Sequence, residues 1–133
     1  MTFRIEMQVR DYELDMQGIV NNGVYFNYLE HARHEFLHAN HVDFAALAKQ
    51  GINLVVLRSE IDYKASLQSG DKFAVEVSLE QLSKVKFGFH QKVIRLSDDK
   101  VCVQALVTGT ALNERGRPFA SPELAALFKD QNG

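Results

Sequence analysis

The feature that most constrains this chain is one long amphipathic helix pattern followed by an unbroken series of strand patterns. From Gly23 onward, apolar residues recur at three- and four-residue spacings, the period of one helical face. The members of that face are Tyr25, Tyr28, Leu29, Ala32 and Phe36. A helix with such a face must be covered, and a curved sheet wrapped around it is the simplest cover.

Strand patterns occupy most of the remaining chain. Alternating or continuous apolar runs cover residues 3–9, 52–65, 72–82, 85–96 and 101–113. The last four of these runs follow one another with only short turns between them. This order predicts a mainly antiparallel sheet and the α+β class.

Two shorter helices are expected at the ends of this series. The first is "FAALAK", with Asp43 as its N-cap and Gly51 as its stop. The second is "SPELAALFKD", with Ser121 as N-cap and Pro122 at its first position.

Length and composition favour one packed domain over residues 1–133. Hydrophobic residues make up 46% of the chain, enough for a core. The 15 Lys and Arg against 17 Asp and Glu give a net charge of -2, which argues against a nucleic-acid groove. Neither a leader nor a membrane-spanning run is visible, and the single cysteine, Cys102, fits a reducing compartment. We therefore expect a soluble cytoplasmic protein without a membrane span.

The residues best suited to catalysis lie in the loop before the long helix. The stretch "ELDMQGIVNNGVYFNYLEHAR" (13–33) places Asp15 and Gly18 ahead of two asparagines. Asn21 or Asn22 is expected to be the helix N-cap. Asp15 suits an Asx-turn, and Gly18 suits a positive φ. The sequence pattern alone does not decide between these structural roles and a role in catalysis or substrate binding.

This loop and helix, with "EHAR" at 30–33 and "IDYKASLQSGDKFAVEV" at 61–77, resemble the hotdog-fold acyl-CoA thioesterases. The likeness is to the hydroxybenzoyl-CoA thioesterase-like group, in particular its long-chain acyl-CoA thioesterase branch with a "VNN" run. The positions that match the family loop are Asp15, Gly18, Ile19, Val20, Asn21, Asn22 and Tyr25. The resemblance implies a hotdog fold, a long central helix wrapped by a curved antiparallel sheet of about five strands.

The resemblance also implies hydrolysis of an acyl or aromatic thioester to free CoA and a carboxylic acid. Asp15 would be the base or the nucleophile, and the N–H of Asn22 or Gly23 at the helix start would receive the oxyanion. The remaining substrate-contacting positions would be Gly18, Asn21 and Tyr25. On this interpretation no metal or other cofactor is needed, and the substrate is an acyl-CoA or alternatively an acyl carrier protein thioester. A sheet of this size has exposed edges, so a homodimer or homotetramer is expected. Asn22 stands where many relatives carry a histidine, which weakens any mechanism that requires an imidazole.

Three other interpretations stay open. One is a non-catalytic acyl-CoA or acyl-carrier-protein binding module on the same fold. A hydroxyacyl dehydratase is disfavoured because no histidine lies in the loop. The run "HEFLH", from His34 to His38, matches a short zinc template but lacks a third ligand, and it lies on the polar helix face. Glu13 is interpreted as a solvated loop acid, and Tyr25 and Tyr28 as core residues.

Overall fold

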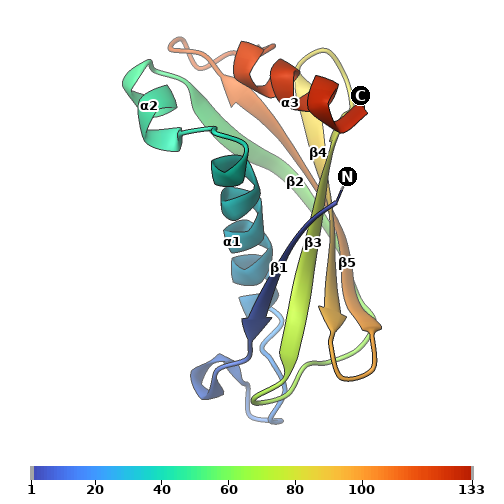
Figure 1. The fold of residues 1–133 in the computed structure, drawn as a ribbon. Coiled ribbons are helices and arrows are strands. Elements are labelled where there is room, and N and C mark those ends of the chain that lie inside the picture. Colours follow the sequence, from blue (N-terminus) through green and yellow to red (C-terminus); the bar gives the residue numbers. More distant parts are fainter. Residues whose placement is uncertain (1, 133) are drawn as a thin grey trace.

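The computed structural model of this protein describes residues 2–132 (Figure 1). The helical elements are the 3-10 helix η1 (Asp11–Glu13), α1 (Val24–Ala39), α2 (Phe44–Lys49) and α3 (Pro122–Asn132). The strands are β1 (Phe3–Gln8), β2 (Asn53–Tyr63), β3 (Lys72–Gln81), β4 (Lys86–Arg95), β5 (Lys100–Leu112) and β6 (Pro118–Phe119).

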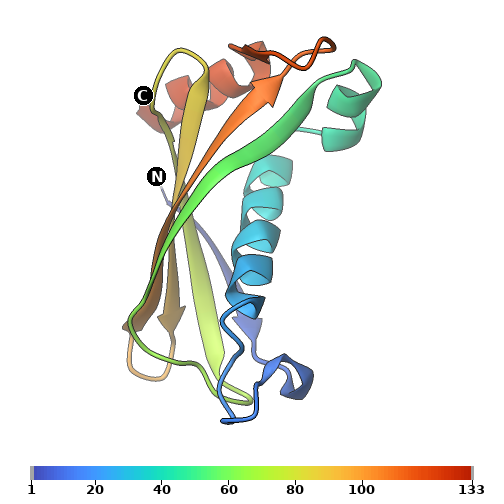
Figure 2. The same cartoon turned by 180° about the vertical axis from the view of Figure 1, so that it is seen from behind.

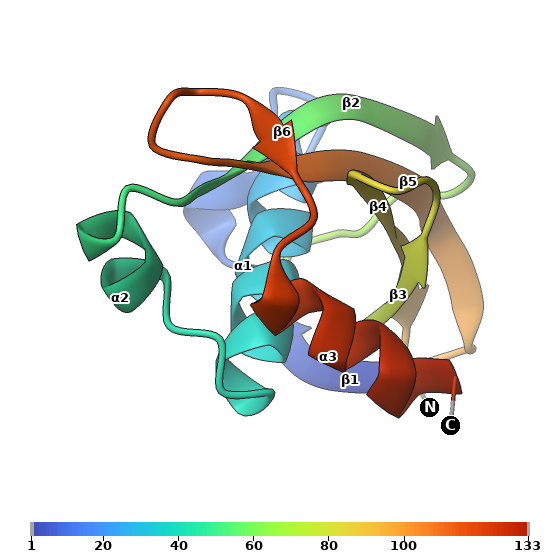
Figure 3. The same cartoon turned by 90° about the horizontal axis from the view of Figure 1, so that it is seen from above.

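The strands form one antiparallel sheet in the order β1-β3-β4-β5-β2, with β6 paired to β5. Seen from above, the sheet curves around α1, and α3 lies across one end of the molecule (Figure 3). The predicted α+β class and hotdog architecture are therefore confirmed. The sequence did not indicate β6, because a two-residue strand is too short to show any period.

The apolar face predicted for α1 is the face that the sheet covers. Its members Tyr25, Tyr28, Leu29, Ala32 and Phe36 are all buried, and Leu37 joins them. The histidines on the other face, His31, His34 and His38, are exposed as expected.

The shorter helices begin where the sequence placed them. Asp43 Oδ1 accepts the N–H groups of Ala45 (2.9 Å) and Ala46 (3.2 Å), which confirms it as the cap of α2. The last helix begins at Pro122, and the Ser121 hydroxyl donates to Glu123 Oε2 (2.8 Å). None of the helices in the described part of the chain has the length and apolar character needed to cross a bilayer.

Candidate active site

The loop that leads into α1 folds into a tight hairpin. The N–H of Asp15 donates to Ile19 O (2.8 Å), and the N–H of Gly18 donates to Asp15 O (3.1 Å). Gly18 has φ +80, a left-handed conformation that a residue without Cβ adopts without strain. The positive φ expected for Gly18 is therefore present, and it lets the loop turn back toward the helix.

Asp15 is half-buried, and its two carboxylate oxygens are used differently. Oδ1 accepts the N–H of Gln17 (2.8 Å) and that of Ile19 (3.4 Å), so the Asx-turn interpretation of Asp15 is correct. Oδ2 accepts from no residue in the described range 2–132. One oxygen thus fixes the carboxylate in the loop, while the other has no hydrogen-bond donor among residues 2–132.

The first turn of α1 differs in detail from the expected cap. The N-cap position is Gly23, so the prediction of Asn21 or Asn22 there was wrong. Asn21 still performs a capping task, since its Oδ1 accepts the N–H of Gly23 (2.9 Å). Of the two predicted oxyanion donors, the Gly23 N–H is therefore occupied. The Asn22 N–H donates to no residue among those the structure describes.

The peptide unit between Asn22 and Gly23 is held at both of its ends. Asn21 binds its N–H, and the Tyr63 hydroxyl donates to its carbonyl, the O atom of Asn22 (3.2 Å). Tyr63 lies at the end of β2, and its ring packs edge-on against that of Tyr25, with centroids 5.7 Å apart. Sequence reasoning missed Tyr63, because nothing local marks a residue 41 positions away as a neighbour of this loop.

Tyr25 belongs to the core, as the structural interpretation of this residue expects. Its hydroxyl accepts the backbone N–H of Leu67 (3.1 Å), which ties α1 to the chain just before β3. Burial raises the pKa of the Tyr25 hydroxyl, so the group stays neutral. A direct contact of Tyr25 with substrate stays a prediction.

The interpretation of Glu13 as a solvated loop acid was wrong, because this residue is only 7% exposed. Its Oε1 accepts the Tyr28 hydroxyl (2.8 Å) and the backbone N–H of Arg10 (2.8 Å). The Arg10 guanidinium lies 3.6 Å from Oε2. Burial and the Glu13 carboxylate raise the pKa of Tyr28 far above its ordinary value. Glu13 therefore anchors the loop to α1, two residues before Asp15.

Replacing Tyr28 with Phe tests this anchor. The variant removes one donor to a buried carboxylate and should lower the free energy of unfolding by about 1.5–3 kcal/mol. Urea unfolding of both proteins measures the difference. A matched Tyr12→Phe variant, at a ring 79% exposed, should leave the free energy of unfolding unchanged. Equal stability of all three proteins would show that the Glu13–Tyr28 contact contributes nothing.

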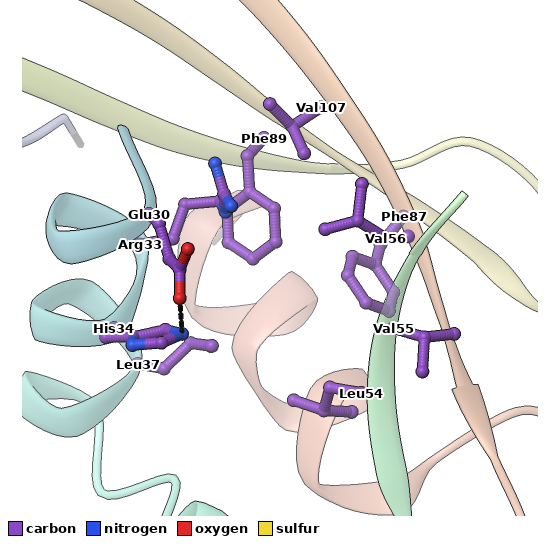
Figure 4. A pocket seen from close by; sticks show the side chains of 11 residues that line it. Glu30, Arg33, His34, Leu37, Leu54, Val55, Val56, Phe87, Phe89 and Val107 are labelled. Atoms are coloured by element: carbon purple, nitrogen blue, oxygen red, sulfur yellow. Dashed lines mark ion pairs between the residues drawn. The ribbon is translucent and has the colours of Figure 1, made fainter. Parts of the chain in front are cut away.

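A groove of about 250 Å³ lies between α1 and the strands β2, β4 and β5 (Figure 4). Its lining residues are Glu30, Arg33, His34, Leu37, Leu54, Val55, Val56, Phe87, Phe89, Val107 and Gly109. The sheet side is apolar, and the helix side carries the charged groups. None of the predicted loop residues is part of this lining.

Gly109 and a strand irregularity shape the groove on the sheet side. The β2–β5 register shifts between Val56 and Arg58. A Cβ on Gly109 would stand 2.8 Å from both Val55 O and the Phe87 ring, so only glycine fits there. The bend and the missing side chain together leave space next to α1.

The "HEFLH" run does not assemble a ligand set in the structure. Among the described residues, no group of three His, Cys, Asp or Glu side chains is placed to hold a metal ion. His34 Nε2 instead lies 3.9 Å from Glu30 Oε1, one turn earlier on α1.

Comparison with known proteins agrees with the fold. The family model described as the thioesterase-like superfamily matches residues 9–128. The acyl-acyl carrier protein thioesterase ATL2, chloroplastic, of Arabidopsis thaliana is 36% identical over 118 residues, which are 89% of this chain and 63% of that protein. This chain thus spans less than two thirds of the plant relative's length.

Two further proteins extend the comparison. The long-chain acyl-CoA thioesterase FadM of Escherichia coli (strain K12) is 33% identical over 104 residues, 77% of each chain. The crystal structure of Slr0204, a 1,4-dihydroxy-2-naphthoyl-CoA thioesterase from Synechocystis, superposes with a TM-score of 0.90, covers 99% of this chain and 98% of that one, and is 19% identical. At this low identity, the superposition supports a shared fold and nothing further. Since the family model covers most of the chain, this protein belongs to the thioesterase-like superfamily.

Proposed function

We propose that this protein is an acyl thioesterase that hydrolyses an acyl thioester to a carboxylic acid and a free thiol. One observation carries the proposal. Asp15 is fixed through one oxygen, has the other oxygen uncommitted, and sits in the loop that ends at the N-terminus of a 16-residue helix. A general base beside a helix N-terminus is the pair of groups that ester and thioester hydrolysis requires.

The chemistry follows from these two groups. A water oxygen attacks the thioester carbonyl carbon while Asp15 takes one water proton, or Asp15 attacks that carbon itself. The negative charge on the carbonyl oxygen meets the Asn22 N–H and the positive end of the α1 dipole. When the tetrahedral centre collapses, the carbon–sulfur bond breaks, and on the water route the leaving thiolate takes the proton that Asp15 had accepted. If Asp15 itself attacks, the thiolate takes a proton from solvent, and a water molecule then hydrolyses the mixed anhydride on Asp15 to release the carboxylic acid. The Gly23 N–H becomes a second donor once Asn21 Oδ1 releases it.

Tyr63 is assigned as a positioning residue for this step. Tyr63→Phe removes the hydroxyl that holds the Asn22 carbonyl, so the neighbouring N–H groups lose part of their alignment. We expect kcat to fall about fivefold, the scale of one hydrogen bond of about 1 kcal/mol, with KM nearly unchanged. Steady-state kinetics of the wild type, Tyr63→Phe and Tyr12→Phe measures this. A fall in kcat that is equal for both variants contradicts a specific role of Tyr63.

The groove beside α1 suits the apolar part of the substrate. Its volume of about 250 Å³ exceeds the cavity of about 150 Å³ that holds a benzene ring in an engineered protein. The plant and Escherichia coli relatives carry names that refer to acyl-carrier-protein and long-chain acyl-CoA substrates. Both kinds of substrate carry an acyl chain, and the proposal includes both.

A second copy of the chain completes the assembly in this proposal. Strand β2 pairs only with β5 among the described strands and lies at the edge of the sheet next to α1 (Figure 2). Apolar side chains on this edge strand are exposed, with Val56 at 53% and Leu57 at 52%. Pairing with a second copy hides such an edge and gives a closed dimer.

Leu57→Lys tests the β2 edge as the subunit contact. A buried lysine at the centre of the contact destabilises it, so we expect the dimer to dissociate to monomers. Light scattering coupled to size-exclusion chromatography measures the mass. A wild type that is monomeric, or a variant that keeps the wild-type mass, excludes β2 as the interface.

The proposed activity is tested by thiol release from a panel of acyl-CoA and acyl-carrier-protein thioesters, covering short, long and aromatic acyl groups. Turnover of at least one thioester well above the uncatalysed rate supports the proposal. Tight binding of acyl-CoA without any thiol release would favour the binding module instead.

A further inference from the structure

Arg33 places a half-buried positive charge on the helix side of the groove. Its Nη1 donates to Gln91 Oε1 (3.1 Å), and Gln91 Nε2 donates to the Leu29 carbonyl (3.0 Å). The buried Gln91 amide is therefore used at both ends and fixes the guanidinium against β4. Burial lowers the pKa of Arg33, as expected for a partly desolvated cation.

The guanidinium has donors left over. Among the described residues, no carboxylate lies within ion-pair distance of Arg33, and the bond to Gln91 is its only side-chain contact with an acceptor. No buried side-chain nitrogen or oxygen among the described residues lacks a partner, so the remaining Arg33 N–H groups reach solvent in the groove. A ligand that displaces this water has to supply an acceptor in its place.

Glu30 adds an acceptor to the same wall. It precedes Arg33 by one helical turn, and both line the groove (Figure 4). The surfaces that face them are apolar and include Phe89 and Val107. A donor and an acceptor thus lie one helical turn apart on a wall that also carries His34, whose Nε2 is 3.9 Å from Glu30 Oε1.

The distance of this pair from the loop sets the length of the ligand. Glu30 and Arg33 follow Gly23 by seven and ten residues, or about 10 Å and about 15 Å along the helix axis. The exposed Phe26 lies four residues before Glu30 on the same helix face. That face therefore runs from the helix start to the groove, and only the far carbons of a long chain reach it.

We propose that the groove binds the far part of a long acyl chain and selects chains that carry a hydroxyl there, recognised by Arg33 and Glu30. This inference rests on the proposed thioesterase function. A hydroxyl accepts a hydrogen bond from the guanidinium and donates one to the carboxylate, so a single group satisfies both. An unsubstituted chain leaves the Arg33 donors unmet, and a terminal carboxylate meets the negative charge of Glu30.

Binding of free acids tests the selection without any need for hydrolysis. Calorimetry compares palmitate, ω-hydroxypalmitate and the matching dicarboxylate on the full chain. We expect the hydroxylated acid to bind at least about tenfold more tightly than palmitate, the scale of one hydrogen bond to a charged group. The same ratio should appear in kcat/KM for the corresponding CoA thioesters.

Two variants separate the roles of the pair. Arg33→Met keeps the apolar stem and should abolish the preference for the hydroxyl. Glu30→Gln changes an exposed side chain and should relax the discrimination against the dicarboxylate. Arg115→Met, which removes an exposed arginine from the turn before β6, should keep the wild-type preference.

The outcomes that overturn the inference are specific. Equal affinity of the wild type for the three acids overturns it, and so does a preference that survives Arg33→Met. Dissociation of a wild-type oligomer by Arg33→Met overturns it too, because the guanidinium then serves a subunit contact. If the protein hydrolyses acyl-CoA but binds the three acids equally, only this inference is wrong. If it prefers the hydroxylated acid but hydrolyses no thioester, the proposed function is wrong instead.

Discussion

Asp15→Asn is expected to lower kcat for thioester hydrolysis at least about a hundredfold, the usual effect of losing a general base. The amide cannot take a proton from water or attack the carbonyl. It does keep an oxygen that can accept the N–H groups of Gln17 and Ile19, and asparagine forms Asx-turns readily. The loop should therefore keep its shape, and the loss of activity reports on chemistry rather than folding.

Kinetics and unfolding measured on the same preparations decide this prediction. The free energy of unfolding of Asp15→Asn should stay within about 0.5 kcal/mol of the wild type. Asp99→Asn is the matched control, because Asp99 is exposed in the β4–β5 turn at φ +56, which asparagine also adopts. Its kcat should be that of the wild type. Equal turnover by wild type and Asp15→Asn removes Asp15 from the mechanism.

Phe36→Ala should cause the largest loss of stability, about 3–5 kcal/mol of the free energy of unfolding. The Phe36 side chain is 1% exposed, and its ring lies 5.7 Å from that of Phe3 on β1 and 6.2 Å from that of Phe89 on β4. Truncation leaves a cavity between the helix and two strands of the sheet. Guanidinium unfolding monitored by circular dichroism measures the difference.

Tyr12→Ala provides the comparison at an exposed ring. Since Tyr12 contributes little buried surface, its truncation should change the free energy of unfolding by no more than about 0.5 kcal/mol. A loss below about 1 kcal/mol in Phe36→Ala would mean that the surrounding core collapses to fill the space.

The fold was largely predictable because burial periodicity is a local property. Tyr28 and Phe36 share a helix face by spacing alone, and the structure buries both. The consecutive strand patterns likewise predicted an antiparallel sheet. The prediction failed at β6, which is too short for a pattern, and at the N-cap of α1, which falls one or two residues beyond the predicted asparagines.

The site was predictable only in part. The turn at Asp15 and the positive φ of Gly18 follow from residues a few positions apart, so the sequence alone suggested them. Glu13 looked solvated because its partner Tyr28 lies 15 residues away and meets it only when the loop packs on α1. Tyr63 meets Asn22 for a similar reason, since the last residue of β2 reaches the helix start only in the folded chain.

The sequence by itself determined the helix face, the succession of strands and the turn at Asp15 and Gly18, because each depends on spacings within one segment. The tertiary structure alone decided which donors at the helix start remain unoccupied and where the groove lies. The Asn22–Gly23 peptide is set by Tyr63, and the groove walls come from α1, β2, β4 and β5. These features require segments far apart in the chain to meet, and no local pattern encodes that meeting.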